Sequence, residues 1–280
     1  MPVVLRSTAK MRPDRATSFL FGVRLTAPVL ALVVVLGVCV PSYLILEPNK
    51  TTEQIGAPCL AAAAVGISIW VMSVSRSVNA YVATNRFVRA CGEKLQRPAV
   101  MTTGIIKPRV VVSEDAMVVL SAKQLELVMR HENAHVLHRD NLKRLLLMLA
   151  PNMIPLVNSF RPLEQAWARC AEWAADDAAS AGSEEDAASL AEALLRVASL
   201  PDNRPRHNAA FTSLFVSNQD LALRIDRLLS ARAMPTHHGN RRMKSIGSIV
   251  TIAIISAICI VLADPPTLVV VHRSLELLMH

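Results

Sequence analysis

The sequence predicts a mainly α-helical membrane protein, with about three transmembrane helices and a cytoplasmic domain that combines helices with two short strands. Three observations lead to this fold class. Of the 280 residues, 52% are hydrophobic, which is too many for a soluble domain of this length. Three apolar stretches are long enough to cross about 30 Å of hydrocarbon as helices. A more polar segment with helix and strand signals of its own separates the second stretch from the third.

The apolar stretches divide the chain into three parts. They cover residues 26–46, roughly 57–74 and 246–263. We expect the first to be a retained anchor and not a cleaved signal peptide, because it has about twenty apolar residues and no small-residue cleavage site. The predicted parts are a tail with two transmembrane helices (1–75), a cytoplasmic domain (76–245), and a last transmembrane helix with a short external tail (246–280).

Charged residues beside the apolar stretches predict their orientation, because short cytoplasmic flanks of membrane helices are rich in Lys and Arg. The N-terminal tail carries five basic residues and one acidic residue: Arg6, Lys10, Arg12, Arg15 and Arg24, with Asp14. A second basic group, Arg241, Arg242 and Lys244, precedes the third stretch. The central domain should therefore face the cytoplasm, and we expect a multi-pass protein of a bacterial-type inner membrane.

The overall charge and the cysteines exclude other classes of protein. The net charge of +8 comes mostly from the membrane flanks, so we expect contact with anionic lipid and no direct binding of nucleic acid. The five cysteines show no paired spacing, and three lie in the apolar stretches. Neither a disulfide framework nor a zinc–thiolate site is expected.

The central domain begins with a helix and two strands. Residues 77–96 continue the second apolar stretch as a helix. Residues 99–113 predict two short strands around Gly104. Pro108 opens the second strand, and a proline at the start of a strand is typical of a sheet edge.

Four helices are expected after the strands. The first is long, with Ser121 as its N-cap and Gln124 as the capping-box partner, and it should run to about Ala150. The other three helices are predicted over residues 162–182, 183–200 and 219–232. Their signals are, in that order, a proline in the first turn, an N-capping serine and an apolar periodicity.

The long helix carries the segment His131-Glu132-Asn133-Ala134-His135. Residues four apart on a helix differ by about 40° in azimuth, so both imidazoles face one point, where they can bind a metal. A catalytic zinc takes three protein ligands and leaves a fourth position for water. Glu132 can take a proton from that water as general base. The spacing predicts Zn²⁺ as cofactor and hydrolysis of peptide bonds as the reaction.

A third ligand must come from elsewhere, and Glu172 is the preferred candidate. Glu172 and Asp176 lie one helical turn apart on a second helix, so one carboxylate can bind metal while the other orients a histidine. Asp177 is the alternative for that supporting role. His138 is the rival for the third ligand, but it lies about 10 Å from His131 along the helix, too far to share one zinc without distortion.

Together these residues resemble the membrane antirepressor metallopeptidases of the BlaR/MecR type. The resemblance covers about Gly104 to Leu229 and includes Pro108, the valine strand, Leu120-Ser121, the HENAH motif, Arg139-Asp140, Glu172 to Asp176, and Arg224-Ile225 with Leu228-Leu229. It implies a zincin-like α+β fold, zinc bound by His131, His135 and Glu172, and Glu132 as the catalytic base.

The sequence also departs from that family's pattern. About 17 residues follow the third apolar stretch, so we expect no extracellular beta-lactam sensor domain. Two transmembrane helices precede the catalytic part, where sensors of this type have three. HtpX-type proteases and CAAX prenyl endopeptidases share both motifs, but they usually place two transmembrane helices between them, and the interval here is too short.

The leading hypothesis is a membrane-anchored zinc endopeptidase that cuts a cytoplasmic or membrane-proximal protein, such as a transcriptional repressor in a signalling pathway. Two alternatives stay open: an HtpX-like quality-control protease, and a signalling or scaffold protein that binds metal without cutting. The presence of Glu132 argues against the second alternative, because a site that only binds metal does not need this carboxylate. The expected partners are a protein substrate and the lipid bilayer, and nothing in the sequence specifies an oligomeric state.

Overall fold

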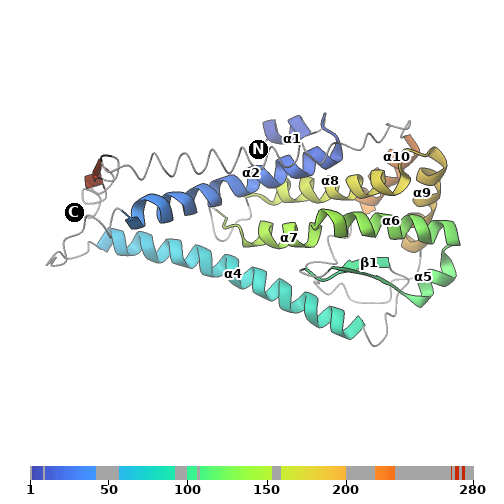
Figure 1. The fold of residues 1–280 in the computed structure, drawn as a ribbon, viewed down its shortest axis with the longest axis horizontal. Helices are drawn as coiled ribbons and strands as arrows, with labels where there is room; N and C mark the ends of the chain where they lie inside the picture. Colours follow the sequence, from blue (N-terminus) through green and yellow to red (C-terminus); the bar gives the residue numbers. More distant parts are fainter. Residues whose placement is uncertain are drawn as a thin grey trace. The chain divides into compact units, whose positions relative to one another are not determined.

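The computed structural model is mostly helical, as the sequence predicts (Figure 1). It describes residues 2–8, 10–41, 57–91, 100–105, 108–152, 159–199, 218–230, 266, 269–270 and 273–274. Its contacts divide the chain into two compact units. The first unit comprises Met1–Arg24 with Ser73–His237, and the second comprises Leu25–Met72 with His238–His280.

Among the described residues, two helices are long and apolar enough to cross a membrane. They are α2 (Pro13–Val34), which continues as the short π-helix η1 (Val35–Cys39), and α4 (Ala57–Cys91). Their apolar segments are Pro13–Gly37 and Leu60–Ala83. Helix α4 continues past its apolar segment to Cys91, as predicted, and residues 92–96 of that prediction lie outside the described residues. The third predicted transmembrane helix, 246–263, lies outside the described residues.

The two predicted strands form a hairpin around Gly104. Strands β1 (Val100–Thr103) and β2 (Arg109–Val112) pair antiparallel, with Val100 opposite Val112 and Thr103 opposite Arg109. Gly104 has φ 87°, a conformation that glycine adopts without steric cost. Helix α5 (Glu114–Val119), which was not predicted, follows directly. The Ser113 hydroxyl caps it by accepting a hydrogen bond from the Ala116 N–H.

The long helix expected to run to Ala150 is interrupted, so that prediction is wrong. Helix α6 (Ala122–His138) starts with the predicted capping box, in which Ser121 and Gln124 exchange hydrogen bonds. Arg139 then adopts a left-handed conformation with φ 53°, and its N–H donates to the carbonyls of His135 and Val136. Helix α7 (Asp140–Leu149) begins at the next residue in a new direction.

The three remaining predicted helices are present. They are α8 (Arg161–Ser180), α9 (Glu184–Ala198) and α10 (Asn218–Ser230). The α8–α9 turn is left-handed at Ala181 and Gly182, and the Ser183 hydroxyl caps α9 by accepting from the Asp186 N–H. The capping and turn residues therefore act where the sequence places them.

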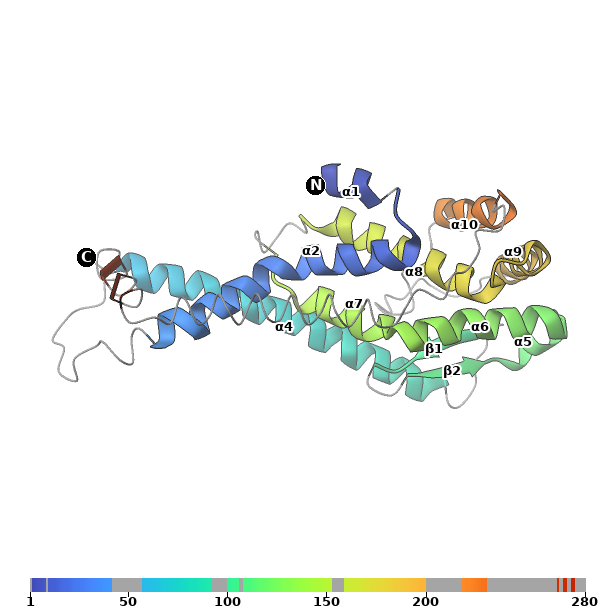
Figure 2. The same ribbon diagram turned by 45° about the horizontal axis from the view of Figure 1, so that its top comes forward.

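Helix α6 is the central element of the first unit. It packs against α8, α9 and the β1–β2 hairpin, and Figures 1 and 2 show it running between α8 and the strands. Buried apolar side chains join α6 to the helices around it: Leu127, Ala179, Ala187, Leu190, Ala191 and Leu228, each at most 4% exposed. This core sets the position of the middle turns of α6, which carry His131.

A second core includes the beginning of α2. Ala16 and Leu20 are at most 1% exposed and pack with Leu163 and Trp167 of α8. The first turns of α2 therefore belong to the core of the first unit, and the apolar stretch predicted from residue 26 begins after them.

Replacing Arg139 with glycine should stabilise the protein. A left-handed conformation costs an L-residue about 1–2 kcal/mol, and the greater freedom of glycine in the unfolded chain offsets part of the gain. We expect a rise of roughly 0.5–1 kcal/mol in the free energy of unfolding, seen as a higher Tm. The same substitution at Arg169, inside α8, should lower it by about 1 kcal/mol. A lower Tm for Arg139→Gly would show that the turn depends on the arginine side chain.

Candidate metal centre

Two histidines of α6 and one glutamate of α8 converge on one point. The Nε2 atoms of His131 and His135 lie 3.2 Å apart, with the rings nearly perpendicular. Carboxylate oxygens of Glu172 lie 3.5 Å from Nε2 of His131 and 3.8 Å from Nε2 of His135. One potential ligand atom from each residue lies within 4.8 Å of the others, so the three can hold a single metal ion.

Each histidine faces a carboxylate with its other ring nitrogen. Nδ1 of His135 lies 2.8 Å from Oδ2 of Asp140, within hydrogen-bonding distance. Nδ1 of His131 lies 3.0 Å from Oδ1 of Asp176, in an ion-pair contact that is not aligned as a hydrogen bond. Because an ionised carboxylate can only accept, the proton of each neutral ring belongs on Nδ1. The Nε2 lone pairs then point toward each other.

With both rings neutral, this arrangement fits a cation, either a proton or a metal ion, and would be unfavourable without one. Two imidazole lone pairs and a carboxylate face one point in a half-buried site, where their mutual repulsion is weakly screened. A metal ion turns the three repelling groups into ligands. Two imidazole nitrogens with one carboxylate oxygen are a donor set found in catalytic zinc sites, which keep an open position for water.

Arg224 of α10 holds both carboxylates of α8. Its guanidinium binds Asp176 through two contacts of 2.7 and 3.0 Å, and its Nη1 lies 3.0 Å from Glu172. Burial favours a lower pKa for Arg224, but the charges of Asp176 and Glu172, with a smaller effect of Glu132, raise its pKa above the usual value. The side chain is 7% exposed, so this bidentate contact is well shielded from water.

The carboxylates of Glu172 and Asp176 are both ionised. Burial alone would raise their pKa values, but His131 and Arg224 outweigh it and lower the pKa of Glu172 and of Asp176 below their usual range. For His131, burial also opposes the charged form, yet the contacts with Asp176 and Glu172 raise its pKa to about 10. The surroundings of His131 therefore favour a positive charge, which a metal ion can supply in place of a proton.

The predicted site residues and their rivals have different neighbours in the structure. Asp176 faces His131, whereas Asp177 binds Arg227 at 2.7 Å. Among the described residues, the three that can share a metal are His131, His135 and Glu172, and His138 is not in this group. The next residue after His131, Glu132, is half-buried on α6, and its carbonyl accepts a hydrogen bond of 2.9 Å from the Thr102 hydroxyl of β1.

Two supporting residues were not predicted as part of the site. Asp140 reaches His135 because the left-handed Arg139 ends α6; on a continuous helix, residues five apart would differ by about 140° in azimuth. No glycine or proline marks that turn in the sequence. Arg224 could have been identified from the sequence, because it lies on the apolar face of its helix together with Leu221, Ile225 and Leu228. An arginine on such a face needs a buried partner.

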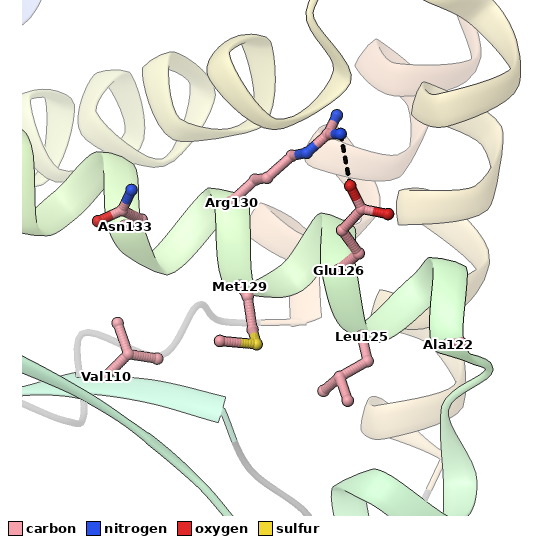
Figure 3. Close-up of a pocket in the computed structure, with 7 residues that line it drawn as sticks. All are labelled: Val110, Ala122, Leu125, Glu126, Met129, Arg130 and Asn133. Carbon is pink, nitrogen blue, oxygen red and sulfur yellow. Dashed lines mark hydrogen bonds and ion pairs between the residues drawn. The ribbon is translucent and has the colours of Figure 1, made fainter.

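A shallow groove of about 580 Å³ runs along α6 beside β2 (Figure 3). Its lining comes from one strand residue and one face of the helix: Val110, Ala122, Leu125, Glu126, Met129, Arg130 and Asn133. Figure 3 shows Leu125, Met129 and Val110 between the helix and the strand, with the Glu126–Arg130 ion pair on the other side of α6. None of His131, His135 and Glu172 lines this groove, and Asn133 lies about 200° around the helix from His131, so the groove occupies a different face of α6 from the metal-binding residues.

With two apolar helices among its described residues and a His-His-Glu group beside a glutamate, the chain has the features of a membrane-associated metallopeptidase. The particular family follows from a comparison with family models, in which the BlaR1 peptidase M56 family matches residues 28–228. The chain therefore belongs to this family, whose metallopeptidases depend on a metal. No curated protein and no solved structure matches the chain.

Metal analysis of two variants tests the choice of the third ligand. Glu172→Ala should strip the metal or weaken its binding severely, because two imidazoles of one helix cannot complete the site alone. His138→Ala should leave the metal content of the purified protein unchanged. Metal kept by Glu172→Ala and lost from His138→Ala would overturn the assignment.

Proposed function

We propose that this protein is a membrane-anchored zinc endopeptidase that hydrolyses peptide bonds of a cytoplasmic or membrane-proximal protein. The observation that carries the proposal is the convergence of His131, His135 and Glu172, with Glu132 adjacent to the first histidine. Membership of the BlaR1 peptidase M56 family supports the same chemistry.

His131, His135 and Glu172 would hold the zinc, and Asp176 would support His131. Zinc bound there would make a water molecule in the site more acidic and would polarise the carbonyl of the substrate. Asp176 and Asp140 keep the ring protons on Nδ1, so that both Nε2 atoms stay available as ligands. Arg224 prevents the carboxylate of Glu172 from turning away, because it binds one of the two oxygens.

Glu132 would act as the general base. Its carboxylate takes a proton from the attacking water and delivers it to the nitrogen of the leaving amine. The hydrogen bond from Thr102 to the Glu132 carbonyl holds this turn of α6 against β1. The active residue is therefore fixed on a helix and supported by a strand, which limits the loss of alignment during the reaction.

The edge position of β2, which precedes α6 in the sequence, supports an extended polypeptide as the substrate. In the described part of the chain, β2 pairs with β1 alone, which leaves its other edge without a strand. A substrate segment can add to such an edge through main-chain hydrogen bonds while its side chains enter the groove. Val110, Leu125 and Met129 would favour apolar side chains there. This mode of binding tolerates varied sequences.

The cellular role is proposed from the sequence. The basic flanks of the apolar stretches favour a cytoplasmic catalytic domain, within reach of soluble regulators. A transcriptional repressor in a signalling pathway is the candidate substrate, because the zinc-helix region resembles antirepressor peptidases. Zinc binding without cleavage is the competing hypothesis, and the position of Glu132 argues against it.

Replacing Glu132 with glutamine should separate metal binding from catalysis. The ligands remain, so the variant should keep about one zinc per chain, but without the proton acceptor its rate should fall at least about 100-fold. The loss of cleavage is measured by mapping new protein termini, which should form in cells that carry the native chain and be absent from cells that carry Glu132→Gln.

Glu192→Gln is a matched control, because Glu192 is an exposed glutamate that pairs with Arg196 on α9. This variant should cleave as the native protein does. Undiminished cleavage by Glu132→Gln would refute the proposed mechanism.

A further inference from the structure

Arg24 lies within an apolar helix, yet its side chain is buried. It falls inside the apolar segment Pro13–Gly37 and is 2% exposed. Farther along the helix, apolar side chains such as Leu30 and Leu36 are exposed by 50% and 58%, as expected for residues that face lipid. A charged side chain in such a helix is costly unless it faces polar groups of the protein.

The guanidinium of Arg24 has several such partners. It donates to the carbonyl of Ala150 at 2.7 Å, to Oδ1 of Asn152 at 3.1 Å, to the carbonyl of Pro151 at 3.2 Å and to Oε1 of Glu164 at 3.2 Å. It also lies 4.3 Å from the ring centre of Phe160. Only the planar fork of an arginine can serve this many acceptors at once.

These partners lie at the junction between α7 and α8. Ala150 and Pro151 follow the last residue of α7, and the positive charge is favourable at this negative end of the helix dipole. Phe160 precedes α8, and Glu164 lies in its first turn. Arg24 therefore ties the end of one helix and the beginning of the next to α2.

The same two helices carry residues of the metal centre. Helix α7 begins with Asp140, whose carboxylate lies 2.8 Å from His135. Helix α8 carries Glu172 and Asp176, about 12 Å and 18 Å beyond Glu164 along its axis. Because packed helices move as rigid pieces, a shift at the α7–α8 junction also displaces these carboxylates.

We propose that Arg24 is a positioning residue that couples helix α2 to the metal centre. The inference rests on the proposed zinc site and adds that zinc affinity depends on how α2 docks. Coupling between two sites is reciprocal, so zinc must also favour the docked state of α2. A role limited to holding the fold together would produce no such effect of zinc on α2.

The first measurement is zinc affinity of the full chain in lipid nanodiscs, by competition with a chelator. Arg24→Met should weaken zinc binding about tenfold or more, as is typical when support of the ligands is lost. Arg24→Lys keeps the positive charge but lacks the planar guanidinium, so its zinc affinity should lie between those of Arg24→Met and the native protein. Arg15→Met removes an exposed arginine from the same helix and should leave the zinc affinity unchanged.

The second measurement needs no variant and is independent of cleavage. Zinc should slow hydrogen exchange at the backbone amides of residues 14–24 in the native chain, and Arg24→Met should abolish this effect.

Unchanged exchange in α2 on adding zinc, or zinc affinity of Arg24→Met within twofold of native, would overturn the coupling. A native chain that binds no zinc would refute the proposed function itself, and the coupling with it.

Discussion

The structure depends on the electrostatic balance around His131. This ring is buried between two carboxylates of α8, and Arg224 of α10 lies against both of them. Buried charges are tolerated when they are paired and hydrogen-bonded, and removing one partner leaves an uncompensated charge that destabilises a protein by about 3–5 kcal/mol. The positions of α6, α8 and α10 are therefore interdependent, because each contributes one member of the cluster.

Packing of the apolar cores sets the positions of these helices, and the polar contacts orient the side chains of the metal centre. Leu127 of α6, one turn before His131, packs with Ala179 of α8, which follows Asp176 by about one turn, and with Leu190 of α9. At the other end, the early part of α2 packs on α8 around Trp167. The metal centre thus lies between two apolar cores that share α8. Such a scaffold keeps the three donor atoms close together before any metal binds.

Much of this arrangement could be predicted from local sequence signals. The capping box at Ser121, the glycine turn at residue 104 and the serine cap of α9 act over a few residues, so they are visible without tertiary structure. The two-histidine motif is also local, since helical geometry alone brings positions 131 and 135 to one face. Glu172 and Asp176 could be selected because they form a spaced pair on one helix.

Features that depend on tertiary contacts could not be found in this way. The left-handed turn at Arg139 has no glycine or proline to mark it, so α6 and α7 were expected to be continuous. The contact of Asp140 with His135 is a consequence of that turn. The partners of Arg24 lie about 130 residues away in sequence, and only the packing of α2 on α8 brings them together.

X-ray absorption at the zinc edge of the purified full chain tests the central claim most directly. We expect one zinc per chain, with two imidazole nitrogens and a carboxylate oxygen at about 2.0–2.2 Å. The spectrum of His131→Ala should show one imidazole fewer, or no bound zinc. A native protein with no zinc, or with zinc bound through sulfur, would contradict the assignment of the site.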